Sequence, residues 1–176
     1  MSGIDVDCPS CAVTHRGTDG TRDRPWPVLA FDLPDPVLEL APHQLRHAEI
    51  SEDLCWIDLP EGTEYYARVS LTMPIRDDPE RRMDYLPWVA LDERHVIDIL
   101  DHLGDDAYRA VYPVRLATEL PDYGRAGPVP MLLHSRGHLR PVIAPDPSCE
   151  HPLVRDLVDG ITRGEAELRI RAFLLR

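Results

Sequence analysis

The sequence predicts an α+β domain built on a mainly antiparallel sheet that a few helices flank. Three observations lead to this prediction. Strand-like segments gather in the middle of the chain, and helix-like segments lie between and after them. The chain has 176 residues, of which 43% are hydrophobic, which suits one domain with a core of its own. We therefore expect a single domain over residues 1–176.

The strands follow from period-two alternation and from short apolar runs. The segment EYYARVSLTMPI at 64–75 shows the clearest alternation, because every second residue from Arg68 to Thr72 is polar and the residues between them are apolar. The run LCWID at 54–58 reads as a buried strand, and YLPWVALD at 85–92 reads as a strand with an edge or bulge at Pro87. Four further segments are expected to be strands: 28–31, 108–120, 128–135 and 139–146.

The helices follow from capping residues and from helical spacing. Asp92 is expected to cap a helix that ends at Gly104, and the apolar residues of this helix fall at helical spacing: Val96, Ile97, Leu100 and Leu103. Shorter or later helices are expected at 43–49, before Gly160, and from Gly164 to the end. Because prolines recur through residues 16–42, that segment is expected to be an extended arm between a small segment at 8–15 and the body at 43–176.

The charge of the chain excludes several functions. There are 31 acidic and 19 basic residues, a net charge of -12, and every basic residue is an arginine. An acidic surface repels phosphate backbones and anionic lipids, which argues against a nucleic-acid partner. The absence of lysine excludes a Schiff base and a phosphate-loop lysine. We find no apolar run of about 18 residues and no signal peptide, so we expect no membrane partner and a cytoplasmic location.

The stretch CPSCAVTH at 8–15 is the strongest candidate for a metal site. Cys8 and Cys11 have the spacing of a knuckle that directs two thiolates at one Zn²⁺ ion, and His15 could add an imidazole. Cys55 is the best candidate for the fourth ligand, and Cys149 and His151 are the next choices. In a reducing compartment these cysteines are not expected to form a disulfide framework, which favours a metal-binding or redox role. A thiol pair without metal remains an alternative.

Several blocks together resemble one bacterial family. They include CPSCAVTH, EDLCWID followed by YYARVSLTMPI, PWVALDE, LATELPDY and RPVIAPDPSCEHPLVRDLVDGIT, in that order over most of residues 8–162. On these blocks the chain resembles the family known as domain of unknown function 2199. It differs from the usual family pattern at Ala12, where glycine is common, and at Cys149. The resemblance implies a single domain with grouped cysteines and histidines, and it implies no reaction.

Five further residues are candidates for chemistry. His151 with Glu150 could act as a base and its orienting carboxylate, or His151 could simply cap a helix. Arg68 and Arg140 could bind a carboxylate or phosphate of a ligand, although period-two alternation also allows Arg68 to face solvent. Trp88 could line an apolar pocket or belong to the core.

These observations leave three functions open. The leading hypothesis is an accessory or ligand-binding module with a structural zinc ion, whose partner is a protein or a small molecule bound on the sheet. The second is a small metal-dependent enzyme of the hydrolase type, with an open zinc site and His151 or Glu150 moving the proton. The third is a thiol-redox protein that uses Cys8 and Cys11.

Overall fold

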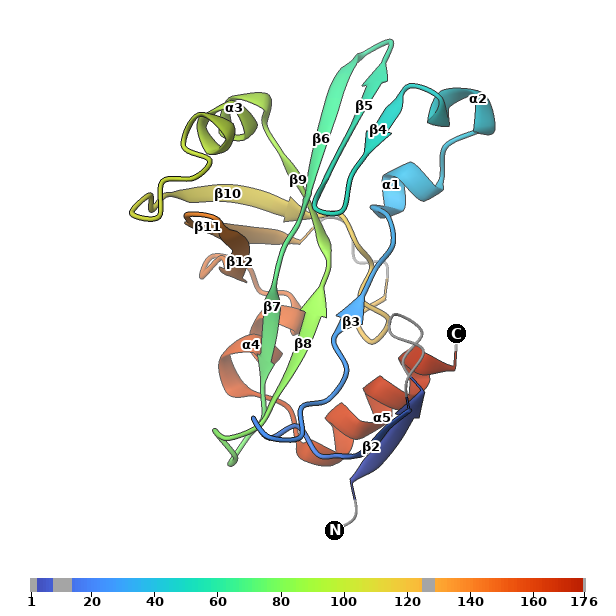
Figure 1. Ribbon diagram of the computed structural model, residues 1–176, viewed down its shortest axis with the longest axis vertical. Coiled ribbons are helices and arrows are strands. Elements are labelled where there is room, and N and C mark those ends of the chain that lie inside the picture. Colours follow the sequence, from blue (N-terminus) through green and yellow to red (C-terminus); the bar gives the residue numbers. More distant parts are fainter. Residues whose placement is uncertain (1–2, 8–13, 125–128, 176) are drawn as a thin grey trace. The chain divides into compact units, whose positions relative to one another are not determined.

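The computed structural model describes residues 3–7, 14–124 and 129–175, and these form two compact units (Figure 1). The first unit is assembled from the described parts of 1–30, 72–85 and 151–176. The second is assembled from 31–71 and from the described parts of 86–150. No helix among the described residues has the length and apolar character needed to cross a membrane.

The second unit is built on a seven-stranded sheet with the order β12-β11-β10-β9-β6-β5-β4. Every pairing between these named strands is antiparallel. The strands are β4 (Ala48–Ile50), β5 (Leu54–Leu59), β6 (Gly62–Arg68), β9 (Trp88–Leu91), β10 (Val111–Leu116), β11 (Pro130–Arg136) and β12 (Leu139–Pro145). The prediction of a mainly antiparallel sheet in an α+β fold is confirmed.

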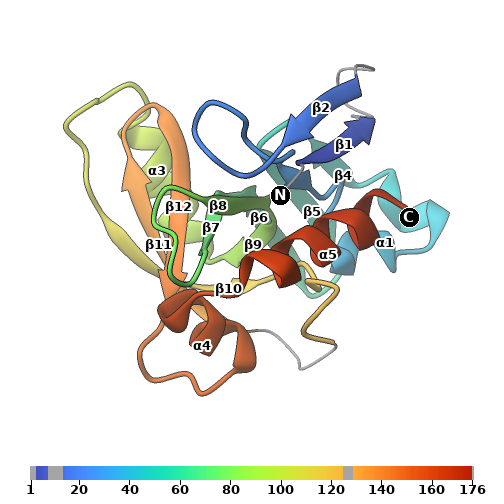
Figure 2. The ribbon, with the colours of Figure 1, turned by 90° about the horizontal axis from the view of Figure 1, so that it is seen from below.

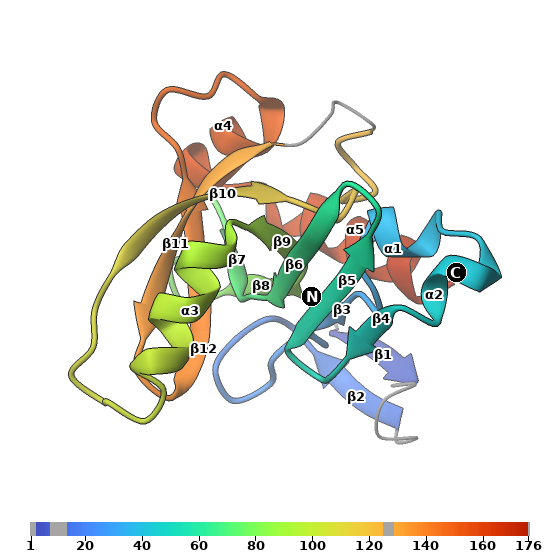
Figure 3. The ribbon, with the colours of Figure 1, turned by 90° about the horizontal axis from the view of Figure 1, so that it is seen from above.

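Three helices accompany this sheet: α1 (Asp35–Leu38), α2 (Pro42–Leu45) and α3 (Glu93–Asp101). Val37 of α1 packs in a buried cluster with Cys55, Tyr66 and Trp88. Leu54 and Ala67, which pair with each other, lie beside α3 instead. Successive residues of a strand point to opposite faces, so α1 and α3 cover opposite faces of the sheet, as Figure 3 also shows.

The first unit combines two small sheets with the two C-terminal helices. Strands β3 (Leu29–Ala30), β8 (Arg82–Leu86) and β7 (Leu71–Pro74) form one sheet in that order, and β1 (Ile4–Asp7) pairs with β2 (Thr14–Thr18). Helices α4 (Pro152–Asp159) and α5 (Arg163–Leu174) follow one another at the C-terminus (Figure 2). Buried side chains from all of these parts form its core: Ile4, Val6, Trp26, Leu29, Met73, Ile75, Met83, Tyr85, Leu153, Ile161, Ala166 and Ile170.

A buried carboxylate and a glycine fix two loops of the first unit. Asp19 is buried and accepts hydrogen bonds from Thr21 and Arg24, while Arg81 donates to its carbonyl at 2.8 Å. The hydrogen bond from Thr21 is the largest reason why the pKa of Asp19 lies below its usual value. Gly160 ends α4 with φ of 75°, and a Cβ there would lie 3.0 Å from the backbone nitrogen of Arg76. Glycine therefore meets both the conformation and the close approach at this position.

The sequence prediction differs from the structure mainly where expected strands are interrupted and where one expected helix is shorter. The expected strand at 64–75 is divided into β6 and β7 at Val69 and Ser70, and the expected strand at 85–92 is divided at Pro87. Proline lacks the N–H that a strand interior needs, which accounts for the second interruption. The helix expected at 43–49 is only the four residues of α2, and β4 follows it. The expected helix after Asp92 and the two C-terminal helices are present, but the Asp92 side chain makes no capping hydrogen bond, so that part of the prediction is wrong.

Candidate functional site

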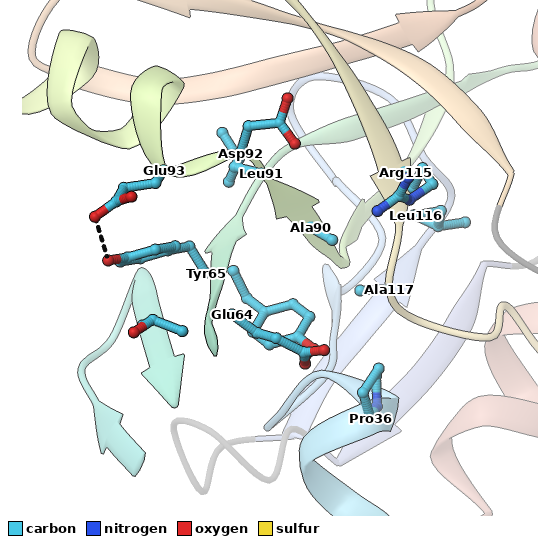
Figure 4. Close-up of a pocket in the computed structure, with 12 residues that line it drawn as sticks. Pro36, Glu64, Tyr65, Ala90, Leu91, Asp92, Glu93, Arg115, Leu116 and Ala117 are labelled. Carbon is cyan, nitrogen blue, oxygen red and sulfur yellow. Dashed lines mark hydrogen bonds between the residues drawn. The ribbon is translucent and has the colours of Figure 1, made fainter. Parts of the chain in front are cut away.

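A cavity of about 460 Å³ opens on the α1 face of the seven-stranded sheet (Figure 4). Segments of β6, β9 and β10 line it, together with the start of α3 and one residue of α1. Its lining residues are Pro36, Thr63, Glu64, Tyr65, Tyr66, Ala90, Leu91, Asp92, Glu93, Arg115, Leu116 and Ala117. All of them belong to the second unit.

The cavity exists because a small residue lies between two large ones. Ala90 of β9 pairs with Tyr66 of β6 on one side and with Arg115 of β10 on the other. Directly paired residues share a face, and neighbouring strands lie about 4.8 Å apart. Tyr66 and Arg115 are therefore separated by roughly 10 Å across a methyl side chain. This arrangement leaves a hollow with Ala90 as its floor.

The wall on the β6 side is a hydrogen-bonded pair. The hydroxyl of Tyr66 donates to the carboxylate of Glu64, two residues earlier on the same face. Tyr66 is 3% exposed, and burial, reinforced by the Glu64 carboxylate, raises the pKa of this phenol well above its usual value. The hydroxyl therefore stays protonated, and it orients the exposed Glu64 carboxylate as a hydrogen-bond acceptor.

Negative charges outnumber positive ones around the cavity. Glu93 accepts a hydrogen bond from the Tyr65 hydroxyl at 3.2 Å, and Asp92 lies 3.3 Å from Arg94. Arg115 forms no ion pair with any residue in the described part of the chain. Three carboxylates and one guanidinium thus line the cavity, with Arg115 across Ala90 from Tyr66. The arrangement can bind a molecule that carries both a cationic and an anionic group.

Three residues singled out in the sequence lie on this same face, beside the cavity. Cys55 pairs with Tyr66, and Arg68 pairs with Trp88. The guanidinium of Arg68 lies 4.8 Å from the ring centre of Trp88 and donates to the carbonyl oxygens of Phe31 and Asp32 at 3.0 Å. Trp88 has 0% exposure and donates its indole N–H to Phe31. Both side chains thus hold the segment that leads into α1.

Cys55 lies in apolar surroundings. It is 1% exposed among Val37, Ile57 and Trp88, and burial raises the pKa of its thiol. A metal ligand must be a thiolate, which this environment disfavours. Within the described ranges, no group of three or more His, Cys, Asp or Glu side chains is arranged to hold a metal ion. The assignment of Cys55 as a zinc ligand stays a prediction.

The other predicted metal ligands belong to the N-terminal segment. Cys8 and Cys11 lie outside the described residues. His15 is exposed on β2, where its backbone pairs with Val6. The zinc segment at 8–15 therefore stays a prediction as well.

The remaining candidates occupy separate places. Nδ1 of His151 accepts a hydrogen bond from the N–H of Leu153 at 3.2 Å, so His151 caps α4, while Glu150 is exposed just before it. Neither residue lines the cavity described above. Arg140 donates to Asp53 at 2.6 Å and lines a different cavity, on the α3 face of the sheet.

Comparison with known proteins identifies the family. A family model described as an uncharacterized protein conserved in bacteria, domain of unknown function 2199, matches residues 7–161. The chain belongs to this family. No curated protein and no solved structure matches the chain.

The match to the domain of unknown function 2199 family covers the whole cavity. All of its lining residues lie within 36–117, well inside the matched range, whereas α5 lies beyond it. The residues that sequence reasoning missed are Glu64, Ala90 and Arg115. Tyr66 lies in the strand expected at 64–75, and the sequence did not mark it as a site residue. A local signal existed in the polar residues of β6 and β10, but only the register of three strands places them around Ala90.

Proposed function

We propose that this protein is a binding module for a small molecule that carries a carboxylate together with one or more amino groups. The observation that carries the proposal is the placement of Arg115 and the Glu64–Tyr66 pair on opposite sides of Ala90. A ligand carboxylate would lie against Arg115, and a ligand ammonium would lie against Glu64. This reading develops the expectation of a small molecule bound on the sheet.

The charges of the lining favour a ligand with more positive than negative charge. Three carboxylates and one guanidinium give the lining an excess of two negative charges when all four groups are ionised. The ring of Tyr65 adds an aromatic surface near Glu93, and cations bind favourably to such surfaces. A basic amino acid has the matching pattern, because its carboxylate suits Arg115 and its two amines suit the carboxylates.

Lysine and two of its analogues test this proposal directly. Cadaverine lacks the carboxylate of lysine, and 6-aminohexanoate lacks its α-amine. We expect isothermal titration calorimetry to rank lysine first. Arg115→Gln should weaken lysine binding about tenfold, since one hydrogen-bonded charge contact is worth about 1.5 kcal/mol, and it should not weaken cadaverine binding. The matched control is Arg171→Gln, which removes an exposed arginine from α5.

A second variant blocks the cavity. Ala90→Leu places a larger side chain between Tyr66 and Arg115 and should abolish lysine binding. Because Ala90 is only half-buried, we expect the variant to remain folded, and its melting temperature checks this. Absence of saturable lysine binding to the wild-type chain would refute the proposal, and so would equal binding of lysine and cadaverine.

The proposal also includes a structural zinc ion at the N-terminal segment and a cytoplasmic protein. Its support is the spacing of Cys8 and Cys11, followed by His15 four residues later. Elemental analysis of the purified, untagged chain should find about one zinc ion per chain. The ion should be lost in Cys8→Ser, together with a fall in melting temperature. A metal-free wild-type chain would refute this part.

A further inference from the structure

A second cavity, of about 180 Å³, lies on the α3 face of the same sheet. Leu54, Ala67 and Leu91 of the sheet line one side of it, and helix α3 lines the other. The contributions from α3 and the residues just after it are mostly apolar: Val96, Ile99, Leu100 and Leu103. An apolar interior of this kind favours an aliphatic group over a polar one.

The apolar surface continues from this cavity to the outside. Leu103 is 70% exposed, Leu100 is 48% exposed and Leu139 of β12 is 47% exposed. These three leucines lie at the cavity, so its apolar lining reaches solvent rather than closing beneath the helix. An aliphatic chain could therefore enter from this side without crossing a polar barrier.

Arg136, His138 and Arg140 place three polar groups of the lining at or beside the β11–β12 turn, and the other polar lining residues are Asp53, Arg68, Tyr108 and Ser135. The two-residue loop Gly137-His138 joins the strands, with Arg136 paired to Leu139. Gly137 has φ of 63°, and a Cβ there would lie 2.9 Å from the Cα of Asp106, so glycine lets the loop at 105–106 approach. This tight turn fixes Arg136 beside the exposed leucine of β12.

The charge balance at this turn leaves one cation uncompensated. Asp53 accepts from Arg140 at 2.6 Å, with Glu52 at 3.6 Å from the same guanidinium, and Asp106 is hydrogen-bonded to His138. Arg136 is exposed and forms no ion pair with the described residues. In a chain of net charge -12, an unpaired arginine at the mouth of an apolar cavity points to an anionic head group.

We propose that the cavity beneath α3 binds a short aliphatic carboxylate, with its chain among the leucines and its carboxylate against Arg136. Arg68 also lines this cavity, but we assign the ligand carboxylate to Arg136, because one guanidinium nitrogen of Arg68 already donates to the carbonyl groups of Phe31 and Asp32 on the other face. This site is separate from the Ala90 cavity and goes beyond the function proposed above.

Octanoate is the probe, and octanol and octylamine are its neutral and cationic counterparts. Titration followed by methyl NMR should show saturable binding of octanoate, with shifts at Ile99 and Leu100. We expect octanoate to bind more tightly than octanol, and octanol more tightly than octylamine. Arg136→Gln should weaken the binding of octanoate by up to about fivefold, which is the effect of losing a partly exposed charge pair, and should leave the binding of octanol unchanged. Arg155→Gln, an exposed change on α4, should have no effect.

A matched pair at Leu103 tests the charge requirement without threatening the fold. Because Leu103 is exposed, Leu103→Asn and Leu103→Asp should both fold, and only the aspartate should repel octanoate beyond the common loss of apolar contact. The proposal fails if octanoate does not saturate. It also fails if octylamine binds as well as octanoate, or if the shifts occur around Ala90. Lysine binding is measured separately, so either site can fail without the other.

Discussion

The two faces of the seven-stranded sheet are built in different ways. On the α1 face, polar side chains of the sheet form hydrogen bonds with the backbone of the segment that covers them: Arg68 and Trp88 both donate to the carbonyl of Phe31. On the α3 face, apolar side chains of the helix line a cavity against the sheet, and a carboxylate of the helix is hydrogen-bonded to two tyrosines, of which Tyr112 is buried. Asp98 accepts hydrogen bonds from the hydroxyls of Tyr108 and Tyr112 there.

This difference explains why each face has a different cavity. A four-residue helix such as α1 cannot cover the α1 face completely, so polar side chains of β6 and β10 remain beside Ala90. The nine-residue helix α3 covers more of its face but leaves leucines exposed along one side. One sheet thus presents a charged hollow and an apolar one on opposite sides.

The largest expected effect tests which face contributes more to stability. Trp88→Ala removes a fully buried indole from the α1 face and should lower the free energy of unfolding by about 3–5 kcal/mol. Trp56 is the matched control, because it is the same residue type in the same sheet, on β5, which β6 separates from β9, and it is only half-buried and faces the other way. Trp56→Ala should cost clearly less in urea denaturation. Equal losses of unfolding free energy in the two variants would mean that the α1 face contributes no more to stability than the α3 face.

The sequence predicted the elements better than it predicted the site. Period-two alternation at 64–75 and the spacing after Asp92 depend on neighbouring residues, so they can be read from one stretch of chain. The hollow above Ala90 depends instead on the pairing of three strands that lie apart in the sequence. Hydrophobic patterning restricts the possible strand registers but does not determine which residues pair.

Arg68 and Trp88 show the same limit in another form. Their residue types suggested a ligand site, and the structure places both against the backbone of Phe31. An arginine on a strand needs hydrogen-bond acceptors, and carbonyl oxygens of a distant segment supply them as readily as a ligand does. Sequence alone cannot distinguish these acceptors. It did correctly indicate that His151 could cap a helix.

A smaller effect is expected at Cys55, on the α1 face. Cys55→Ser places a hydroxyl among apolar neighbours and should lower the free energy of unfolding by about 1–3 kcal/mol. Cys55→Ala removes only the sulfur and should cost about 1 kcal/mol. Elemental analysis of both variants should find the zinc content of the wild-type chain, because the surroundings disfavour a thiolate. Loss of zinc in both would instead make Cys55 a ligand, as the sequence suggested.

The smallest effect concerns the polar contacts that anchor α3. Hydrogen bonds from Tyr112 and then Tyr108 hold the pKa of Asp98 below its usual value of 3.8. A carboxyl with a lowered pKa contributes stability at pH values above the unfolded-state pKa and loses it as the pH falls through the folded-state pKa. Asp98→Asn should therefore lower the melting temperature at pH 7, and the difference from wild type should shrink as the pH falls below about 4. Asp101→Asn, an exposed change on the same helix, is the matched control for the loss of a carboxylate. If the difference in melting temperature between wild type and Asp98→Asn were the same at all pH values, the charge of Asp98 would not contribute to stability.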